Sequence, residues 1–347
     1  MTKSNKLSLN FFKGFNSKKW DLILNNFNST VNYTSWFLNY IEVLNSSSEI
    51  KNYSFILFYN KKPVAIVPLY VEVIGQNSQI SMGQEPINAP IFSSSTPDEK
   101  IAKFYEFIIN EVDRIAKRYD CILARFHYSP LLFNNNSENY FLKFGYGSEI
   151  VDPDWYIFKS NFSYVVDLRE PIEVLIKNIR SRYRTNINRT KDKVNLIILD
   201  KLYFDERIFE KYMRLYFQVK GSKRSLEAFK LDEFAIKSGY ESLLICEYKN
   251  ILISAIAIHT HNKKARYNSS IQLYNVVKSI YPNHFLLKSS IEYLKKNNYE
   301  LYEIGEQVSL GKSHKVSKKE ENLSHFKAGW GGKLFPSIKV QKEFKNV

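Results

Sequence analysis

The chain has 347 residues, of which 44% are hydrophobic and 15% aromatic, so it can bury about two domain cores and is not an intrinsically disordered chain. Its most apolar run, residues 251–258, has the length of a strand and is too short to cross a bilayer. The first residues lead into no apolar signal core, so we expect no transmembrane segment and a cytoplasmic location. Cys121 and Cys246 lie in separate apolar runs, which argues against a disulfide framework or a cysteine-based metal cage.

In the first half of the chain, the pattern predicts a hairpin, a helix and a strand. Residues 53–59 and 64–73 have the composition of two strands joined by a short turn. A helix is expected from about Asp98 to Lys117, and a strand from Cys121 to His127.

The second half repeats this order. Residues 242–248 and 251–261 form another predicted hairpin, with its turn at Lys249 and Asn250. A helix follows at about residues 283–296, and a strand at residues 300–306.

This repeated order predicts the α/β (α+β) class, with two similar domains that each hold a mixed, mostly antiparallel sheet flanked by helices. The segment Asp152-Pro153-Asp154 interrupts the pattern. We therefore place an N-terminal domain at residues 1–160 and a C-terminal domain at residues 161–347.

A basic segment opens the second predicted domain. Seven basic residues and one acidic residue lie between Lys177 and Lys193. Pro171 and apolar residues spaced three and four apart predict one helix, on which Arg180 and Arg184 stack one turn apart. Two guanidinium groups so placed suit the recognition of phosphate or carboxylate. The alternative is a solvated basic face.

The net charge of +15 favours contact with nucleic acid, an anionic cofactor or an anionic lipid surface. The chain is rich in Asn, Lys, Ile and Tyr throughout, and a compositionally biased genome would encode an ordinary enzyme in the same way. The total charge therefore does not choose a partner.

A glycine-rich run near the end of the chain has the composition of a site. Residues 326–332, FKAGWGG, set Lys327 between aromatic residues and follow a predicted strand that carries Glu303 and Glu306. Because Glu303 and Glu306 are three residues apart, strand alternation predicts that they point to opposite faces, so that one of them enters the site. We favour Glu303.

Several of these segments together resemble a known family. The order of Tyr164–Leu168 and the basic Ile179–Arg189 is similar to the element that opens the second domain of FemABX-type and BioF2-like or CelD-like acyltransferases of the GNAT superfamily. The further segments follow in the family's order, over residues 160–335: Ala265–Ser270, Leu286–Ile291, Tyr302–Gly305 and Phe326–Gly332.

The resemblance implies transfer of an acyl or aminoacyl group from an activated donor to an amine, such as that of an amino sugar or a cell-envelope precursor. The donor would be acyl-CoA, a co-substrate and not a tightly bound cofactor, or alternatively an aminoacyl-tRNA. Both donors are polyanionic, so charge does not decide between them, and DNA is not an expected partner. Lys327 would stabilise the oxyanion or bind a donor phosphate, and Glu303 or Glu306 would accept the amine proton.

Other residues complete the predicted site. Arg180, Arg184, Tyr267, Asn268 and Phe326 are expected to bind substrate, although an aromatic residue at the position of Tyr267 more often belongs to the core. Asn283 and His284 start a predicted helix whose free amide groups could bind a donor phosphate, but the glycine-rich pyrophosphate loop of ordinary GNAT enzymes is not evident there.

The sequence also bears on two other classes of site or function. His259 and His261 alternate onto one face of a strand without a third ligand at a telling spacing, so we expect no metal site. A non-catalytic binder of RNA or another polyanion on the same scaffold is the alternative from a different functional class.

Overall fold

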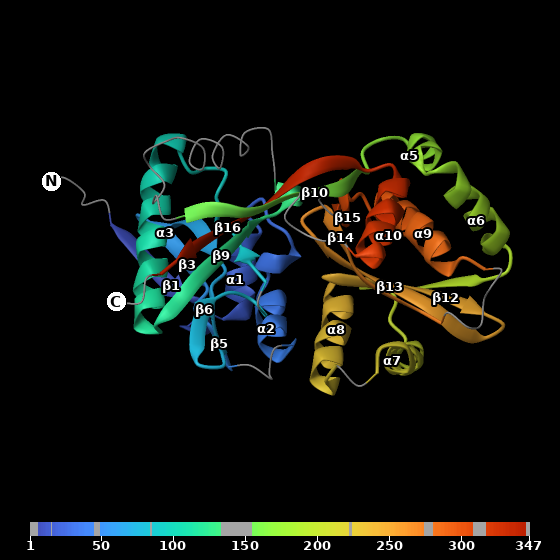
Figure 1. Ribbon diagram of the computed structural model, residues 1–347, viewed down its shortest axis with the longest axis horizontal. Helices are drawn as coiled ribbons and strands as arrows, with labels where there is room; N and C mark the ends of the chain where they lie inside the picture. The colour runs from blue at the N-terminus through green and yellow to red at the C-terminus, as the bar shows by residue number, and fades with distance from the viewer. Residues whose placement is uncertain are drawn as a thin grey trace. The chain divides into compact units, whose positions relative to one another are not determined.

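The computed structural model describes residues 6–14, 16–44, 49–83, 85–132, 155–221, 224–273, 280–307 and 317–344, with the backbone alone at residues 156–160. The chain forms two compact units (Figure 1). Unit 1 consists of Met1–Ser160 and Pro336–Val347, and unit 2 consists of Asn161–Phe335. Within the described residues, no helix combines the length and hydropathy that a membrane span requires.

In the residues of unit 1 that the structure describes, the strands form two sheets, accompanied by three α-helices. The first sheet has the order β1-β3-β4-β8, with strands Leu7–Phe11, Phe55–Tyr59, Lys62–Val67 and Ile91–Phe92. The second has the order β16-β9-β6-β5-β2, with strands Lys333–Glu343, Cys121–Tyr128, Asn77–Ile80, Tyr70–Ile74 and Glu49–Asn52, and β7 (Ile87–Asn88) pairs with β9. The helices are α1 (Ser17–Leu24), α2 (Ser35–Leu44) and α3 (Asp98–Arg118).

The first predicted hairpin is correct only in part. β3 and β4 pair antiparallel, but the predicted second strand, 64–73, is divided between β4 and β5. β5 pairs with β2 and β6 in the other sheet. The division falls at Pro68, which has no amide hydrogen to donate to a continuous ladder.

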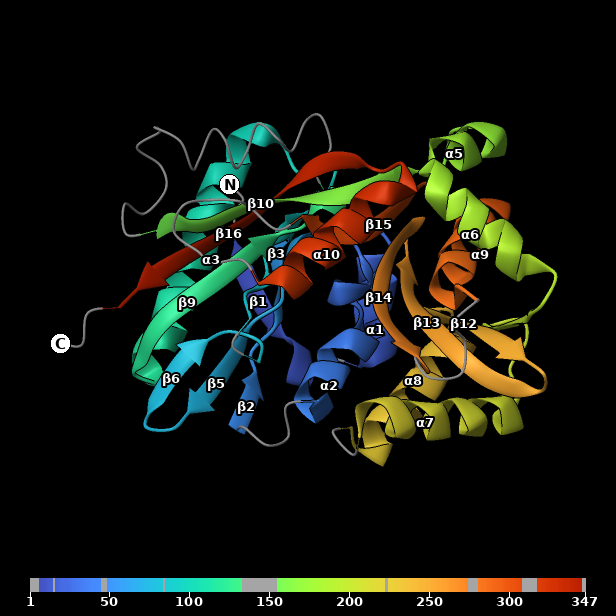
Figure 2. The ribbon, with the colours of Figure 1, turned by 45° about the vertical axis from the view of Figure 1, so that its right-hand side comes forward.

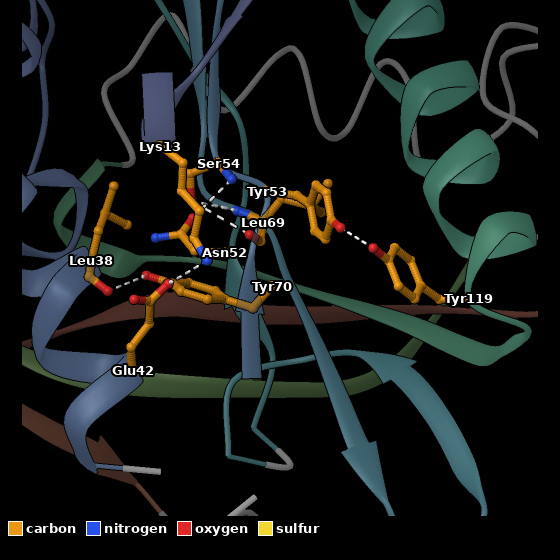
Figure 3. A network of polar contacts seen from close by, with 9 residues as sticks. All are labelled: Lys13, Leu38, Glu42, Asn52, Tyr53, Ser54, Leu69, Tyr70 and Tyr119. Carbon is orange, nitrogen blue, oxygen red and sulfur yellow. Dashed lines mark hydrogen bonds and ion pairs between the residues drawn. The ribbon is translucent and has the colours of Figure 1, made fainter. Parts of the chain in front are cut away.

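Polar contacts fix the segments around this division (Figure 3). The Tyr53 amide donates to the Leu69 carbonyl at 2.7 Å, and the Ser54 amide donates to Asn52 Oδ1 at 2.9 Å. The Tyr70 hydroxyl donates to the Leu38 carbonyl at 3.1 Å, which ties β5 to α2. Because Tyr70 is buried, its pKa is raised, so this hydroxyl remains a donor across the physiological range.

The C-terminal segment belongs to unit 1, whereas the sequence assigned all of residues 161–347 to the second domain. β16 pairs antiparallel with β9 from Ile338 opposite Tyr128 to Glu343 opposite Leu123. Lys342 Nζ also donates to Asp113 Oδ2 of α3 at 3.0 Å. This pairing joins residues about 200 positions apart, so no local pattern could have predicted which sheet the last strand enters.

Unit 2 is built on a sheet with the order β11-β12-β13-β14-β15-β10. The strands, in that order, are Asn195–Leu199, Glu241–Tyr248, Ile251–His261, Lys264–Gln272, Leu301–Gln307 and Trp155–Asp167. The helices are α5 (Ile172–Asn178), α6 (Ser181–Lys191), α7 (Glu206–Lys220), α8 (Leu226–Ser238), α9 (Pro282–Lys296) and α10 (Lys318–Lys327). All these pairings are antiparallel except that of β14 with β15, which is parallel.

Helices cover both faces of this sheet (Figure 2). On one face α5, α6 and α9 bury residues such as Leu175, Ile187 and Leu287 against the strands. On the other face α7 and α8 bury Phe209 and Phe229. Mostly antiparallel sheets with flanking helices in both units confirm the predicted fold class.

The predicted basic helix is divided into two. α5 ends at Asn178 and α6 begins at Ser181, while Ile179 and Arg180 are extended, with ψ of 133° at each. The Arg180 amide donates to the Gly329 carbonyl at 2.9 Å instead of continuing a helix. The apolar stripe spans the break, so its period alone did not reveal it.

Candidate active site

Lys327 is the last residue of α10, and its side chain extends to β15. Its Nζ donates to the Glu306 carbonyl at 3.3 Å. Burial lowers the pKa of Lys327 below the usual value for lysine, while the nearby carboxylates of Glu306 and Glu303 oppose that shift. Lys327 is therefore a partly desolvated cation that faces two acidic side chains.

Gly305 makes room for this lysine. Its φ is +126°, a conformation that other residues rarely adopt, and a Cβ at this position would lie 2.8 Å from Lys327 Nζ and 3.0 Å from its Cε. The glycine therefore allows both the irregular backbone of β15 and the passage of the lysine side chain across it.

A β-bulge at this glycine brings Glu303 and Glu306 to the same face. The register places Tyr164 opposite Gly305 and the next residue, Val165, opposite Glu303, so that Ile304 is the extra residue. The predicted opposite orientation of the two glutamates is wrong, because the bulge shifts the strand alternation by one residue.

Contacts from β10 support this assignment. Ser163 Oγ donates to Glu303 Oε1 at 2.9 Å, and Asn161 Nδ2 donates to Glu306 Oε2 at 3.1 Å. Asn161 and Ser163 are two residues apart on one strand and so share a face. The two carboxylates therefore lie side by side along β15.

Arg266 on β14 is the second cation of the cluster. Its Nε lies 3.7 Å from Glu303 Oε2, and it also contributes to lowering the pKa of Lys327. Glu303 is only 3% exposed, whereas Glu306 is half-buried. A buried carboxylate requires such partners, because its desolvation is costly. We call Lys327, Glu303, Glu306, Arg266, Ser163 and Asn161 the acid–lysine cluster.

The strands that carry this cluster stop pairing beside it. The parallel pairs of β14 and β15 run from Lys264 opposite Leu301 to Arg266 opposite Glu303. Both strands continue beyond the last pair, β14 to Gln272 and β15 to Gln307. Arg266 and Glu303 therefore mark the point where two adjacent parallel strands separate.

Tyr267 and Asn268 follow directly on β14 but do not join the cluster. Tyr267 is half-buried and packs against the core beneath α9, in agreement with the alternative of a core aromatic. Asn268 is exposed and is the extra residue of a second bulge, because Ile258 pairs with Tyr267 and Ala257 with Ser269.

Phe326 and His284 belong to an aromatic cluster next to Lys327. The ring of His284 lies 4.6 Å from Tyr183 and 5.3 Å from Phe326, and Trp330 lies 5.7 Å from Phe326. Burial, with a smaller contribution from Arg182, lowers the pKa of His284 to about 4, so its imidazole is neutral at pH 7. These rings join α6, α9 and α10 and fix the end of α10.

Two further residues predicted to bind a ligand form hydrogen bonds with neighbouring residues. Asn283 Oδ1 accepts a hydrogen bond from Ser254 Oγ at 2.8 Å. Arg184 Nη1 donates to the carbonyls of Lys177 and Ile179, where α5 ends.

Arg180 lies against the end of α10 and does not form a joint fork with Arg184. Its guanidinium is 5.2 Å from the centre of the Tyr183 ring, and its Nη1 is 3.0 Å from His325 Nε2.

A stability prediction arises from Gly329. A Cβ there would lie 2.1 Å from Cε2 of the buried Tyr183 ring. We expect Gly329→Ala to lower the free energy of unfolding by about 1–3 kcal/mol, measured by chemical denaturation. Gly14→Ala is the matched control, because no atom lies within 4 Å of a Cβ at that position. Equal stability of the two variants would contradict this account of the aromatic cluster.

The sequence did not identify Arg266, Ser163 and Asn161 as site residues. The i, i+2 spacing of Asn161 and Ser163 on a strand was the available signal, but it has meaning only once the bulge at Gly305 is known. Among the described residues, no group of three or more His, Cys, Asp or Glu could hold a metal ion.

No family model matches this sequence, and no curated protein matches it. Several solved structures, in contrast, are similar to this chain in fold. The structure of FemX has a TM-score of 0.66 at 10% identity and covers 95% of this chain and 96% of that chain. L-PGS from Bacillus licheniformis has a TM-score of 0.59 at 12% identity, covering 96% of this chain and 93% of that chain.

The C-terminal domain of a putative lysylphosphatidylglycerol synthetase from Agrobacterium fabrum has a TM-score of 0.54 at 11% identity, covering 94% of this chain and 90% of that chain. These likenesses extend over nearly the whole chain. The protein therefore has a fold like that of FemX and L-PGS, in agreement with the predicted resemblance to FemABX-type proteins.

Proposed function

We propose that the protein is an acyltransferase that moves an acyl group from acyl-CoA to the amino group of an amino sugar or a cell-envelope precursor. The observation that carries the proposal is the acid–lysine cluster, in which Lys327 faces Glu303 and Glu306 on one side of a bulged strand. The similarity in fold to FemX and to L-PGS supports transfer chemistry of this kind.

In this reaction the neutral amine attacks the acyl carbonyl carbon, a C–N bond forms, and negative charge develops on the carbonyl oxygen. The ammonium group of Lys327 stabilises that oxyanion or binds a donor phosphate. When the tetrahedral intermediate collapses, the C–S bond to coenzyme A breaks. The proton lost by the amine passes to a carboxylate, and the thiolate leaves with the bonding electron pair.

Glu303 is the better candidate for the base. Ser163 and Arg266 hold its carboxylate in place, and its burial favours a fixed position next to the reacting amine. Glu306 is half-buried, and Asn161 Nδ2 donates to its carboxylate. Its role is to balance the charge of Lys327.

An aminoacyl-tRNA donor is the second candidate. It is favoured by exposed basic side chains on α6 and directly after it, namely Arg182, Arg189, Lys191 and Lys193. A polyanionic donor of that size would contact such a surface. A non-catalytic binder of RNA or another polyanion would use the same residues without turnover.

A ligand panel tests these assignments. We expect acetyl-CoA or a longer acyl-CoA to raise the Tm of the full chain, because a ligand that binds only the folded state stabilises it. Charged tRNA and the same tRNA without its amino acid form the second arm. Stabilisation by charged tRNA, reduced by salt, would move the donor assignment to aminoacyl-tRNA, and stabilisation by none of these ligands would overturn both.

A further inference from the structure

A row of polar side chains crosses four adjacent strands and ends at the acid–lysine cluster. Glu241 pairs with His259, His259 pairs with Arg266, and Arg266 pairs with Glu303. Residues that lie directly opposite one another on adjacent strands place their side chains on the same face of the sheet. Glu241, His259 and Glu303 are each 3% exposed, whereas the Arg266 side chain is 45% exposed. Arg266 is thus the one member of this row that reaches solvent.

The neighbour of Arg266 on β13 is uncharged. His259 Nε2 lies 3.2 Å from Glu241 Oε2. Burial, together with the charges of Arg266 and Arg224, lowers the pKa of His259, and burial raises the pKa of Glu241. The imidazole next to Arg266 is therefore neutral, and Glu303 is the anionic partner of Arg266 in this row.

The guanidinium of Arg266 has N–H donors that are available to bind a ligand. Arginine presents five N–H donors in a planar fork. In the part of the chain that the structure describes, the contact of Arg266 with a carboxylate is the 3.7 Å approach of its Nε to Glu303, and its terminal amino groups donate no hydrogen bond. By comparison, Arg169 binds both carboxylate oxygens of Asp167 at 2.7 Å.

The charge balance of the reaction indicates what these donors bind. The cluster contains two cations, Lys327 and Arg266, and two carboxylates, Glu303 and Glu306. When Glu303 accepts the amine proton it loses its negative charge, and Arg266 is left without a compensating anion. An anionic group on the acceptor would restore the balance at that step.

We propose that Arg266 binds a carboxylate or phosphate group of the acceptor and so selects amines that carry an anionic group. The assignment of this ligand as the acceptor rests on the proposed function. The binding chemistry itself rests on the row of residues from Glu241 to Glu303.

Matched acceptor pairs test the inference. Glucosamine 6-phosphate and glucosamine differ by a phosphate, and L-lysine and cadaverine differ by a carboxylate. We expect the wild-type enzyme to prefer an anionic member, and Arg266→Gln to raise the ratio of KM for that member to KM for its neutral partner about tenfold or more. Arg266→Lys should keep part of the preference. The acceptor pair whose KM ratio changes in Arg266→Gln shows whether Arg266 binds a phosphate or a carboxylate group.

Arg169→Gln is the control, because Arg169 is also an exposed arginine paired with a carboxylate. It should leave both KM values unchanged, and the unfolding transitions of all variants should coincide. Equal effects of Arg266→Gln on the anionic and neutral members, or a wild-type enzyme that does not discriminate, would overturn the inference.

Direct binding separates this inference from the proposed function. Calorimetry with glucosamine 6-phosphate and with L-lysine, without any donor, measures the anion site alone. Binding that Arg266→Gln abolishes, in a protein that turns over no donor, would support the anion site and refute the acyltransferase. Turnover with binding that does not depend on Arg266 would support the acyltransferase and refute the anion site.

Discussion

Replacement of Lys327 by alanine is expected to lower kcat about 100-fold to 1,000-fold, with a smaller change in donor affinity. Loss of a preorganised donor to an oxyanion has an effect of this size, because the group acts most strongly where charge develops in the transition state. The measurement is steady-state kinetics with the donor that stabilises the wild-type protein. A non-catalytic polyanion binder would have no turnover to lose.

The pH dependence adds a second readout for Lys327. Burial lowers its pKa below the ordinary lysine value, so the active ammonium form should be lost on the alkaline side at a lower pH than for an exposed lysine. Lys327→Arg keeps a cation that does not titrate, and any remaining activity should then lack that alkaline decline. Lys333→Ala, at an exposed position six residues later, is the matched control and should change neither kcat nor the profile. An unchanged kcat in Lys327→Ala would refute the assigned role.

Glu303→Gln should lower kcat about 100-fold to 10,000-fold, because the amide cannot accept the amine proton. The substitution keeps the volume of the side chain and an oxygen that can still accept the hydrogen bond from Ser163. Folding should therefore be little affected, and circular dichroism and thermal unfolding would verify this.

Two neighbouring glutamates make the test specific. Glu306→Gln should lower kcat less than Glu303→Gln does. Glu300→Gln should have no effect, because Glu300 forms an exposed ion pair with Lys263 at 2.8 Å. A larger loss in Glu306→Gln than in Glu303→Gln would assign the base to Glu306.

Local patterns predicted part of the secondary structure of unit 2. The hairpin of β12 and β13, the helix α9 and the strand β15 all occur where period-2 and period-3.6 spacing placed them. The turn at Lys249 and Asn250 has positive φ at both residues, as a two-residue hairpin turn requires. These signals are local, since each depends on residues less than one element apart.

The sequence by itself also predicted Lys327, Glu303 and Glu306 as site residues, because a glycine-rich segment with one lysine follows a strand with two carboxylates. The tertiary structure decided how they meet. A bulge at Gly305 turned both glutamates to one face, hydrogen bonding to Gly329 divided the basic helix at Arg180, and pairing with β9 drew β16 into unit 1.

Arg266 illustrates the same limit, because its relation to Glu303 exists only through the parallel pairing of β14 with β15. Periodicity reports which face of an element is buried, and the sequence could determine that much. Register, bulges and strand order depend on hydrogen bonds between distant segments, so the geometry of this site was decided only when the chain folded.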